Sequence, residues 1–93
     1  MLNRLRSSRG GESTSGTAAS RLVSVFAEVF RLPQERVHPN LGPSDVERWD
    51  SVGHVMLVTA VEREFSIQFD VDEIMEFTSF LAMLSAIERR MAA

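Results

Sequence analysis

The sequence predicts an all-α fold, a four-helix bundle with a short third helix and a long loop between the first two helices. Several segments repeat apolar residues at steps of three and four, which is the spacing of one helix face. No window alternates polar and apolar residues as a half-buried strand does. With 93 residues, 44% of them hydrophobic, the chain suits one small domain with a single core.

The first helix and the long loop follow one another directly. Apolar residues recur at helical spacing from Ser20 to Leu32, and Pro33 is expected to end that helix. The next stretch, QERVHPNLGPSDVERW, contains two prolines and a Leu-Gly-Pro, which predicts a loop. We expect four apolar side chains to hold this loop against the bundle: Val37, Leu41, Val46 and Trp49. In the alternative interpretation, the Trp49 indole N–H donates a hydrogen bond to a partner protein.

Three more helices are expected after the loop. The second runs from about Ser51 to Phe65 and buries one face, made of Leu57, Val58, Val61 and Phe65. Asp70, with Glu73 three residues later, predicts a capping-box start for the short third helix, whose buried side is Ile74 and Phe77. Thr78 or Ser79 then caps a fourth helix with an apolar face of Phe80, Met83, Leu84, Ile87 and Met91.

Composition excludes several classes of function. The absence of cysteine rules out disulfides, thiolate zinc sites and cysteine nucleophiles. The longest apolar stretch, residues 55–61, is too short to insert across a bilayer. From residue 18 onward, seven arginines stand against twelve acidic residues, a net charge of −5. A nucleic-acid-binding domain shows the opposite balance, so we expect basic protein partners.

Residues 1–17 differ from the rest of the chain. They are rich in Ser, Gly and Thr, lack hydrophobic periodicity, and contain three arginines. We therefore expect a disordered leader at 1–17 and a folded domain at 18–91. The alternative is a mitochondrial presequence, which is also rich in Arg and Ser. We prefer a cytoplasmic, bacterial location.

The stretch WDSVGHVML places Ser51 where the second helix begins, and three interpretations compete. Asp50 or Ser51 can be the N-cap of that helix. A Ser-His-Asp triad is not expected, because Asp50 and Ser51 are neighbours and no Gly-x-Ser-x-Gly elbow is present. In the third interpretation Ser51 carries a phosphodiester, which the positive end of the helix dipole would stabilise.

The arrangement of the whole chain resembles the acyl carrier protein family over roughly residues 18–91. The long Pro/Gly loop, Asp-Ser-Val at 50–52, the helix ending EREF, and SIQFDVDEIMEFTSFLAMLSAI together carry the resemblance. Family members are four-helix bundles with an Asp-Ser-Leu motif, whose serine carries 4′-phosphopantetheine transferred from coenzyme A. The resemblance implies that Ser51 is the attachment point and that Asp50 helps a synthase to position it, beside the synthase's Mg²⁺.

The resemblance also implies the function and its partners. A carrier of this kind is not an enzyme. It holds an acyl, hydroxyacyl or aminoacyl group as a thioester on the arm and delivers it between enzymes of fatty-acid or specialised-metabolite (polyketide) synthesis. The expected partners are a phosphopantetheinyl transferase and acyl-loading and acyl-transferring enzymes, with the carrier itself a monomer. The alternative is a helical protein-interaction module in which Ser51 is only a helix cap.

The second helix departs from the family pattern in the residues that would meet a partner. Family members of bulk fatty-acid synthesis have many acidic residues here, whereas this helix keeps only Glu62 and Glu64, near its end. We therefore expect docking through Val52, Val55 and Met56, with Glu62 as a rim charge. For Val55 and Met56 the alternative is core packing.

Other residues of this region have two interpretations each. Gly53 either leaves room for the arm or a partner backbone, or is a tolerated first-turn glycine. His54 is expected to face solvent, with a phosphate contact as the alternative. An expected core, formed by Leu57, Val61, Phe77 and Leu84, could also shelter an acyl chain in part. Asp70 and Asp72 lack the rest of a calcium-binding loop, so we expect helix capping there and no metal site.

Overall fold

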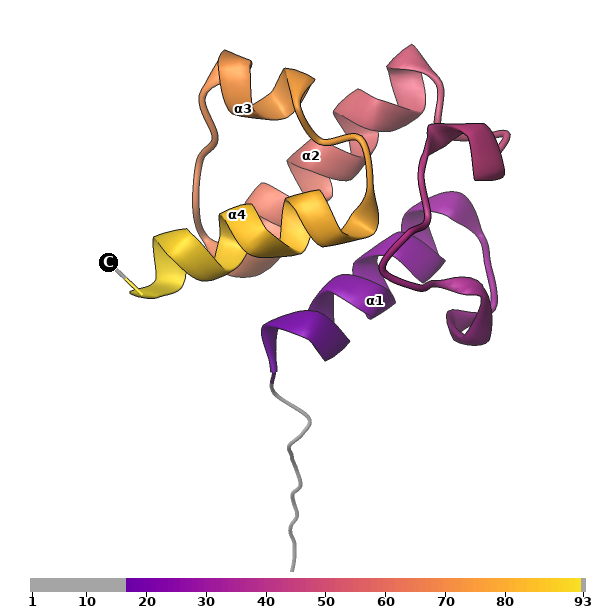
Figure 1. Ribbon diagram of the computed structural model, residues 1–93, viewed down its shortest axis with the longest axis horizontal. Coiled ribbons are helices and arrows are strands. Elements are labelled where there is room, and N and C mark those ends of the chain that lie inside the picture. Colours follow the sequence, from indigo (N-terminus) through magenta and orange to yellow (C-terminus); the bar gives the residue numbers. More distant parts are fainter. Residues whose placement is uncertain (1–16, 93) are drawn as a thin grey trace, which may run out of the picture.

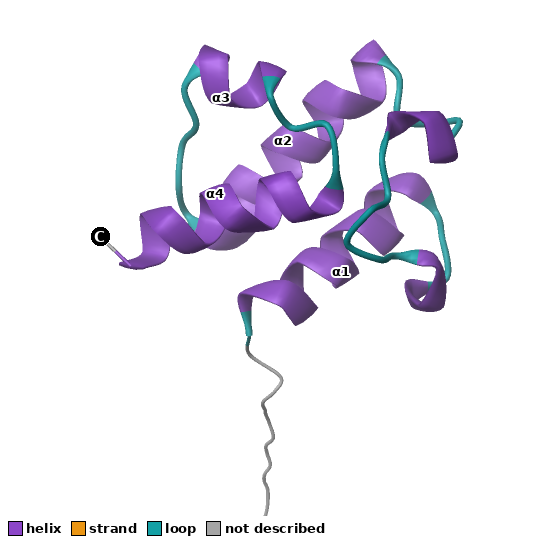
Figure 2. Ribbon diagram, in the orientation of Figure 1, coloured by secondary structure: helices purple, strands orange, loops and turns teal. Residues whose placement is uncertain are grey.

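Four α-helices and two short 3-10 turns make up the fold. The computed structural model describes residues 17–92, and within them no strand is present. The helices are α1 Ala18–Phe30, α2 Ser51–Phe65, α3 Val71–Met75 and α4 Phe80–Ala92. Figure 1 shows the long helices α1, α2 and α4, with short α3 connecting the end of α2 to the start of α4, and Figure 2 shows the same view coloured by secondary structure. The predicted all-α bundle, with its short third helix and long first connection, is confirmed.

Helix α1 begins and ends two residues earlier than predicted. It begins early because the Thr17 hydroxyl accepts the Ser20 N–H at 3.0 Å and so caps the first turn. It ends early because Arg31 adopts left-handed backbone with φ 57° and closes the last turn. Pro33 therefore follows the helix end rather than causing it. Of the expected leader, residues 1–16 lie outside the described part of the chain.

The connection from α1 to α2 is tied to the bundle by apolar side chains and by backbone hydrogen bonds. It contains two 3-10 turns, Gln34–Arg36 and Pro43–Asp45, and it buries Leu41, Val46 and Trp49 as expected, with Val37 half-buried. Its carbonyl groups also satisfy the start of α4. The Phe80 N–H donates to the Leu41 carbonyl at 2.8 Å, and the Leu81 N–H donates to the Pro39 carbonyl at 3.0 Å. The loop is therefore held in place up to the first residue of α2.

An aromatic cluster forms the part of the core below this loop. The Phe26 ring packs edge-to-face on Trp49 at 5.3 Å and on Phe80 at 5.1 Å. The Phe30 ring stacks on Trp49 at 5.4 Å. Trp49 is only 4% exposed, so its expected role of packing the loop over the bundle is confirmed. Because Trp49 is fixed, so is the chain at Asp50 and Ser51, immediately after it.

Short α3 is held by polar contacts at its start. The Glu73 carboxylate accepts the Asp70 N–H at 3.0 Å and pairs with Arg90 of α4. This confirms the capping box that was predicted for Asp70 and Glu73. Phe77 is buried, but it lies after the end of α3. The Ser79 hydroxyl accepts the Ala82 N–H and caps α4. At the other end of α4, Met91 was predicted on the apolar face, but its side chain is half exposed.

The contacts of Glu73 predict that acid loosens α3. The Asp70 N–H and the Arg90 guanidinium hold the pKa of Glu73 below its ordinary value of 4.5. A carboxyl whose pKa is lowered by folding adds stability that is present above 4.5 and is lost as the pH falls through the lower, folded value. We expect Glu73→Gln to melt below the wild type at neutral pH, with the gap in melting temperature narrowing as the pH falls below 4.5.

Thermal melts followed by circular dichroism across this pH range test that prediction. Glu76→Gln removes an exposed carboxylate from the same short segment and is the matched control, expected to leave the melting temperature unchanged. A gap between Glu73→Gln and the wild type that stays constant with pH would show that the charge of Glu73 does not stabilise the fold.

Candidate functional site

The start of α2 presents the Ser51 side chain to solvent. The Asp50 carboxylate is the N-cap, because it accepts the Gly53 N–H at 2.8 Å. Ser51 is the first helical residue and is exposed. The capping bond thus belongs to Asp50, and the view of Ser51 as only a helix cap is wrong. Its hydroxyl is left for another role.

Within the described part of the chain, the same helix end has backbone N–H groups that remain free to bind a ligand. The Asp50 side chain and backbone carbonyl take the N–H groups of Gly53 and His54. The N–H groups of Ser51 and Val52 have no backbone acceptor within residues 17–92. Unpaired N–H groups and the helix dipole favour an anion at this point. A phosphodiester on the Ser51 hydroxyl suits the residues present.

Gly53 is required by close packing within the chain itself. It is buried, and a Cβ atom at this position would lie 1.9 Å from the Arg48 carbonyl oxygen. The end of the loop therefore passes directly over the first turn of α2. The interpretation of Gly53 as a merely tolerated glycine is therefore wrong, because the glycine makes room for the loop backbone. That it also leaves room for the arm or a partner stays a prediction.

His54 links the loop, α2 and α3, so the expectation that it faces solvent is wrong. The Trp49 indole N–H donates to His54 Nδ1 at 2.8 Å, and His54 Nε2 lies 2.8 Å from the Ile74 carbonyl oxygen of α3. Because the indole only donates and the carbonyl only accepts, the ring is the neutral tautomer with its proton on Nε2. Both ring nitrogens are occupied, which leaves His54 no nitrogen for a phosphate.

A groove of about 450 Å³ opens beside Ser51. The loop, the first turn of α2, the end of α3 and the segment after it form its walls. The lining residues are Pro43, Trp49, Asp50, Ser51, His54, Met75, Phe77 and Thr78. Its walls combine aromatic and apolar surface with the Thr78 hydroxyl and the His54 ring. Such a groove can hold a flexible, partly polar group attached at its edge.

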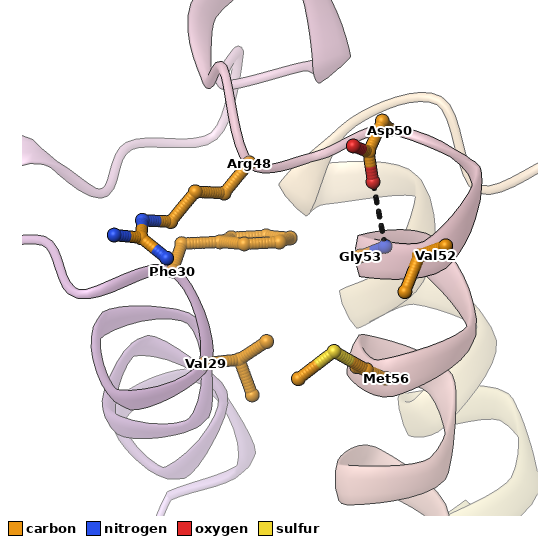
Figure 3. A pocket seen from close by; sticks show the side chains of 7 residues that line it. All are labelled: Val29, Phe30, Arg48, Asp50, Val52, Gly53 and Met56. Atoms are coloured by element: carbon orange, nitrogen blue, oxygen red, sulfur yellow. Dashed lines mark hydrogen bonds between the residues drawn. The ribbon is translucent and has the colours of Figure 1, made fainter.

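A second, smaller cleft of about 190 Å³ lies between the end of α1 and the start of α2. Figure 3 shows Val29 of α1 facing Met56 of α2 across it, with Val52 on the same side as Met56 and the Arg48 side chain running from the loop towards the end of α1, beside Phe30. Val52, Val55 and Met56 are 68%, 63% and 54% exposed. Core packing of Val55 and Met56 is therefore wrong, and α2 presents an apolar surface to solvent.

The comparison with known families decides the class of this protein. Residues 20–87, most of the chain, match the sequence model of the family described as phosphopantetheine attachment site. The chain belongs to the acyl carrier family. In this family the matched domain is where 4′-phosphopantetheine is attached covalently. A search of curated protein sequences finds no match to the chain.

In this carrier both acidic residues near the end of α2 have structural partners. The Glu62 carboxylate accepts the Phe69 N–H at 2.9 Å and so holds the segment that leads to α3. The Glu64 carboxylate pairs with Arg21 of α1 at 3.0 Å. The role of Glu62 in partner binding stays a prediction, and any test must preserve its hydrogen bond to Phe69.

The interior of the carrier is filled by its own side chains. Leu57 and Val61 are fully buried, Phe77 is 4% exposed, and Leu84 is half-buried against the same core. All four have the core role expected of them. Within residues 17–92 there is no cluster of three or more potential metal ligands, and no helix of that region is long and apolar enough to cross a membrane.

The sequence patterns did not predict that five further residues belong to the site: Val29, Arg48, Ile74, Met75 and Thr78. Val29 and Arg48 line the smaller cleft, and the other three belong to the groove beside Ser51 or to the His54 contact. Met75 is 75% exposed, a property that the sequence pattern did not reveal. Ile74 contributes only its carbonyl group, which no side-chain pattern reveals.

Proposed function

We propose that Ser51 carries the 4′-phosphopantetheine arm of this carrier. The observation that supports it most is the exposed Ser51 hydroxyl at a helix N-terminus whose capping bond Asp50 already makes. In arm transfer, a bond forms between Ser51 Oγ and the arm's phosphorus, the pyrophosphate bond of coenzyme A breaks, the nucleotide half leaves, and the transferase takes the hydroxyl proton. Asp50, exposed beside Ser51, helps the transferase to position the serine.

The carrier then holds an acyl, hydroxyacyl or aminoacyl group as a thioester and delivers it between enzymes of fatty-acid or specialised-metabolite synthesis. The chain has no cysteine, so the arm supplies the thiol. A long tether also raises the effective concentration of the cargo at each partner's active site. In this proposal the chain performs no catalysis. It works as a monomer in the cytoplasm, with residues 18–91 as the carrier domain and 1–17 as a leader.

Partner enzymes dock on the apolar surface of α2 made by Val52, Val55 and Met56. These exposed side chains, together with the small cleft beside Val29, offer a partner an apolar contact. Arg48 lines one edge of that cleft, beside Phe30 (Figure 3), so a carboxylate at the edge of the partner's surface suits it. Glu62 lies further along α2 and acts at the rim.

Loading with the arm tests the proposal. The wild-type chain, incubated with coenzyme A and a broad-specificity phosphopantetheinyl transferase, should gain the mass of one arm in intact mass spectrometry, and Ser51→Ala should gain none. Thr59→Ala, an exposed hydroxyl on the same helix, is the control and should load like the wild type. Unchanged wild-type mass, or loading of Ser51→Ala, would refute the assignment of Ser51.

A further inference from the structure

The boundary between α2 and α3, next to Ser51, is closed by a chain of two hydrogen bonds. The chain runs from the Trp49 indole through the His54 ring to the Ile74 carbonyl oxygen, and both bonds are 2.8 Å long. Ser51 and His54 line the same groove. The His54 ring therefore lies at the place where a group attached to Ser51 would have to pass to enter the bundle between these helices.

The His54 ring is held in place by buried Trp49. The rings of His54 and Trp49 stack with an interplanar angle of 14° and a centroid distance of 6.2 Å. Trp49 in turn stacks on Phe30 and is buried. Any outward movement of His54 would leave a buried indole N–H without an acceptor, which is unfavourable. Trp49 therefore holds the His54 ring in place between α2 and α3.

The α3 side depends on the same ring. Helix α3 has only five residues, and its other polar anchors, at Asp70 and Glu73, lie towards its start. The bond from His54 to Ile74 holds the later part, next to the groove. Behind this contact, Leu57 and Val61 are fully buried. The route from the groove beside Ser51 to these residues, between α2 and α3, leads past His54.

We propose that His54 is a specificity-determining residue that keeps the cargo of this carrier outside the bundle. This rests on the attachment of the arm to Ser51. With the boundary closed, the cargo stays in the open groove formed by Trp49, Phe77 and Thr78, and the carrier is suited to short acyl groups. A long alkyl chain would remain in water, which is unfavourable in proportion to its apolar area.

Amide NMR spectra of the loaded protein test this proposal. Wild type, His54→Leu and His54→Gln are each loaded from acetyl- or octanoyl-coenzyme A by the transferase, and loading is checked by mass. In the wild type, the two cargoes should differ only at groove residues, leaving Leu57 and Val61 unshifted, and both forms should melt at the same temperature.

The two variants should then separate. Leucine offers no hydrogen bond, so octanoyl-loaded His54→Leu should show shifts at Leu57 and Val61 and melt several degrees above its acetyl form, because a sheltered chain stabilises the fold. Glutamine offers one donor and one acceptor, so His54→Gln should behave like the wild type. Should His54→Leu fail to fold, Trp49→Phe, which keeps a ring but removes the N–H donor, takes its place with the same expectation.

Other outcomes overturn the inference. Octanoyl shifts at Leu57 and Val61 in the wild type would mean that the boundary opens for a long chain despite His54. Wild-type behaviour of His54→Leu would mean that His54 does not control access. Failure of the wild type to load, seen by mass before any spectrum is recorded, would refute the attachment site and the inference together.

Discussion

Replacing Gly53 with alanine is expected to destabilise the protein by about 3 kcal/mol or more. Alanine normally favours a helix over glycine by about 1 kcal/mol, so propensity alone predicts the opposite sign. Packing outweighs propensity here because the new Cβ would lie 1.9 Å from the Arg48 carbonyl oxygen. That atom belongs to backbone fixed by buried Trp49 next to it, which cannot move away cheaply.

Chemical denaturation with fluorescence of the single tryptophan measures this effect. Thr59→Ala, on the exposed face of α2, is the control and should change stability by no more than about 0.5 kcal/mol. If Gly53→Ala proved as stable as the wild type or more so, the loop would not pass as closely over α2 as described, and the fixed position of Asp50 and Ser51 would lose its explanation.

Replacing Met56 with glutamate is expected to lower kcat/KM for arm transfer by roughly 30-fold or more. The change places a charge in the middle of the proposed apolar contact of Val52, Val55 and Met56, where a partner offers it no counter-charge. Met56 is 54% exposed in the free protein, so the fold should tolerate glutamate. Kinetics with a phosphopantetheinyl transferase, on variants of equal helical content by circular dichroism, measure the effect.

Two matched variants serve as controls for the effect of Met56→Glu on arm transfer. Met91→Glu makes the same change at a side chain of similar exposure, 51%, in the last turn of α4, and should leave transfer unchanged. Glu62→Gln removes the charge but keeps an acceptor for the Phe69 N–H, and should slow transfer only slightly, since rim charges affect mainly the association rate. If Met56→Glu transferred the arm at the wild-type rate while Glu62→Gln did not, apolar docking would be wrong and docking through acidic residues would be supported.

Local patterns predicted the fold well where the deciding contacts are local. The bounds of α2 follow from an Asp-Ser cap and an apolar face, and both signals are read within a few residues. The bounds of α1 differ from the prediction because Thr17 caps the helix by accepting the Ser20 N–H, and because Arg31 adopts a left-handed backbone. The apolar periodicity used to predict the helix carries neither signal. The position of Ser51 at the start of α2 followed from the same local pattern.

The rest of the site depends on contacts between distant segments. Gly53 is explained by the Arg48 carbonyl oxygen, His54 by the Ile74 carbonyl oxygen, and Glu62 by the Phe69 N–H. Each partner is a backbone group, which every residue possesses, so side-chain identity gave no signal. A histidine in the first turn of an exposed helix therefore suggested solvent, although tertiary packing gave it two partners.

The attachment of the arm to Ser51 is the central claim, and fragmentation of one peptide tests it most directly. Cleavage after Arg48 and Arg63 of the loaded wild-type chain releases residues 49–63, which contain two hydroxyl side chains, those of Ser51 and Thr59. Tandem mass spectrometry should place the whole added mass on Ser51, with every fragment that lacks residue 51 unmodified. An added mass on Thr59, or on any peptide other than 49–63, would contradict the assignment.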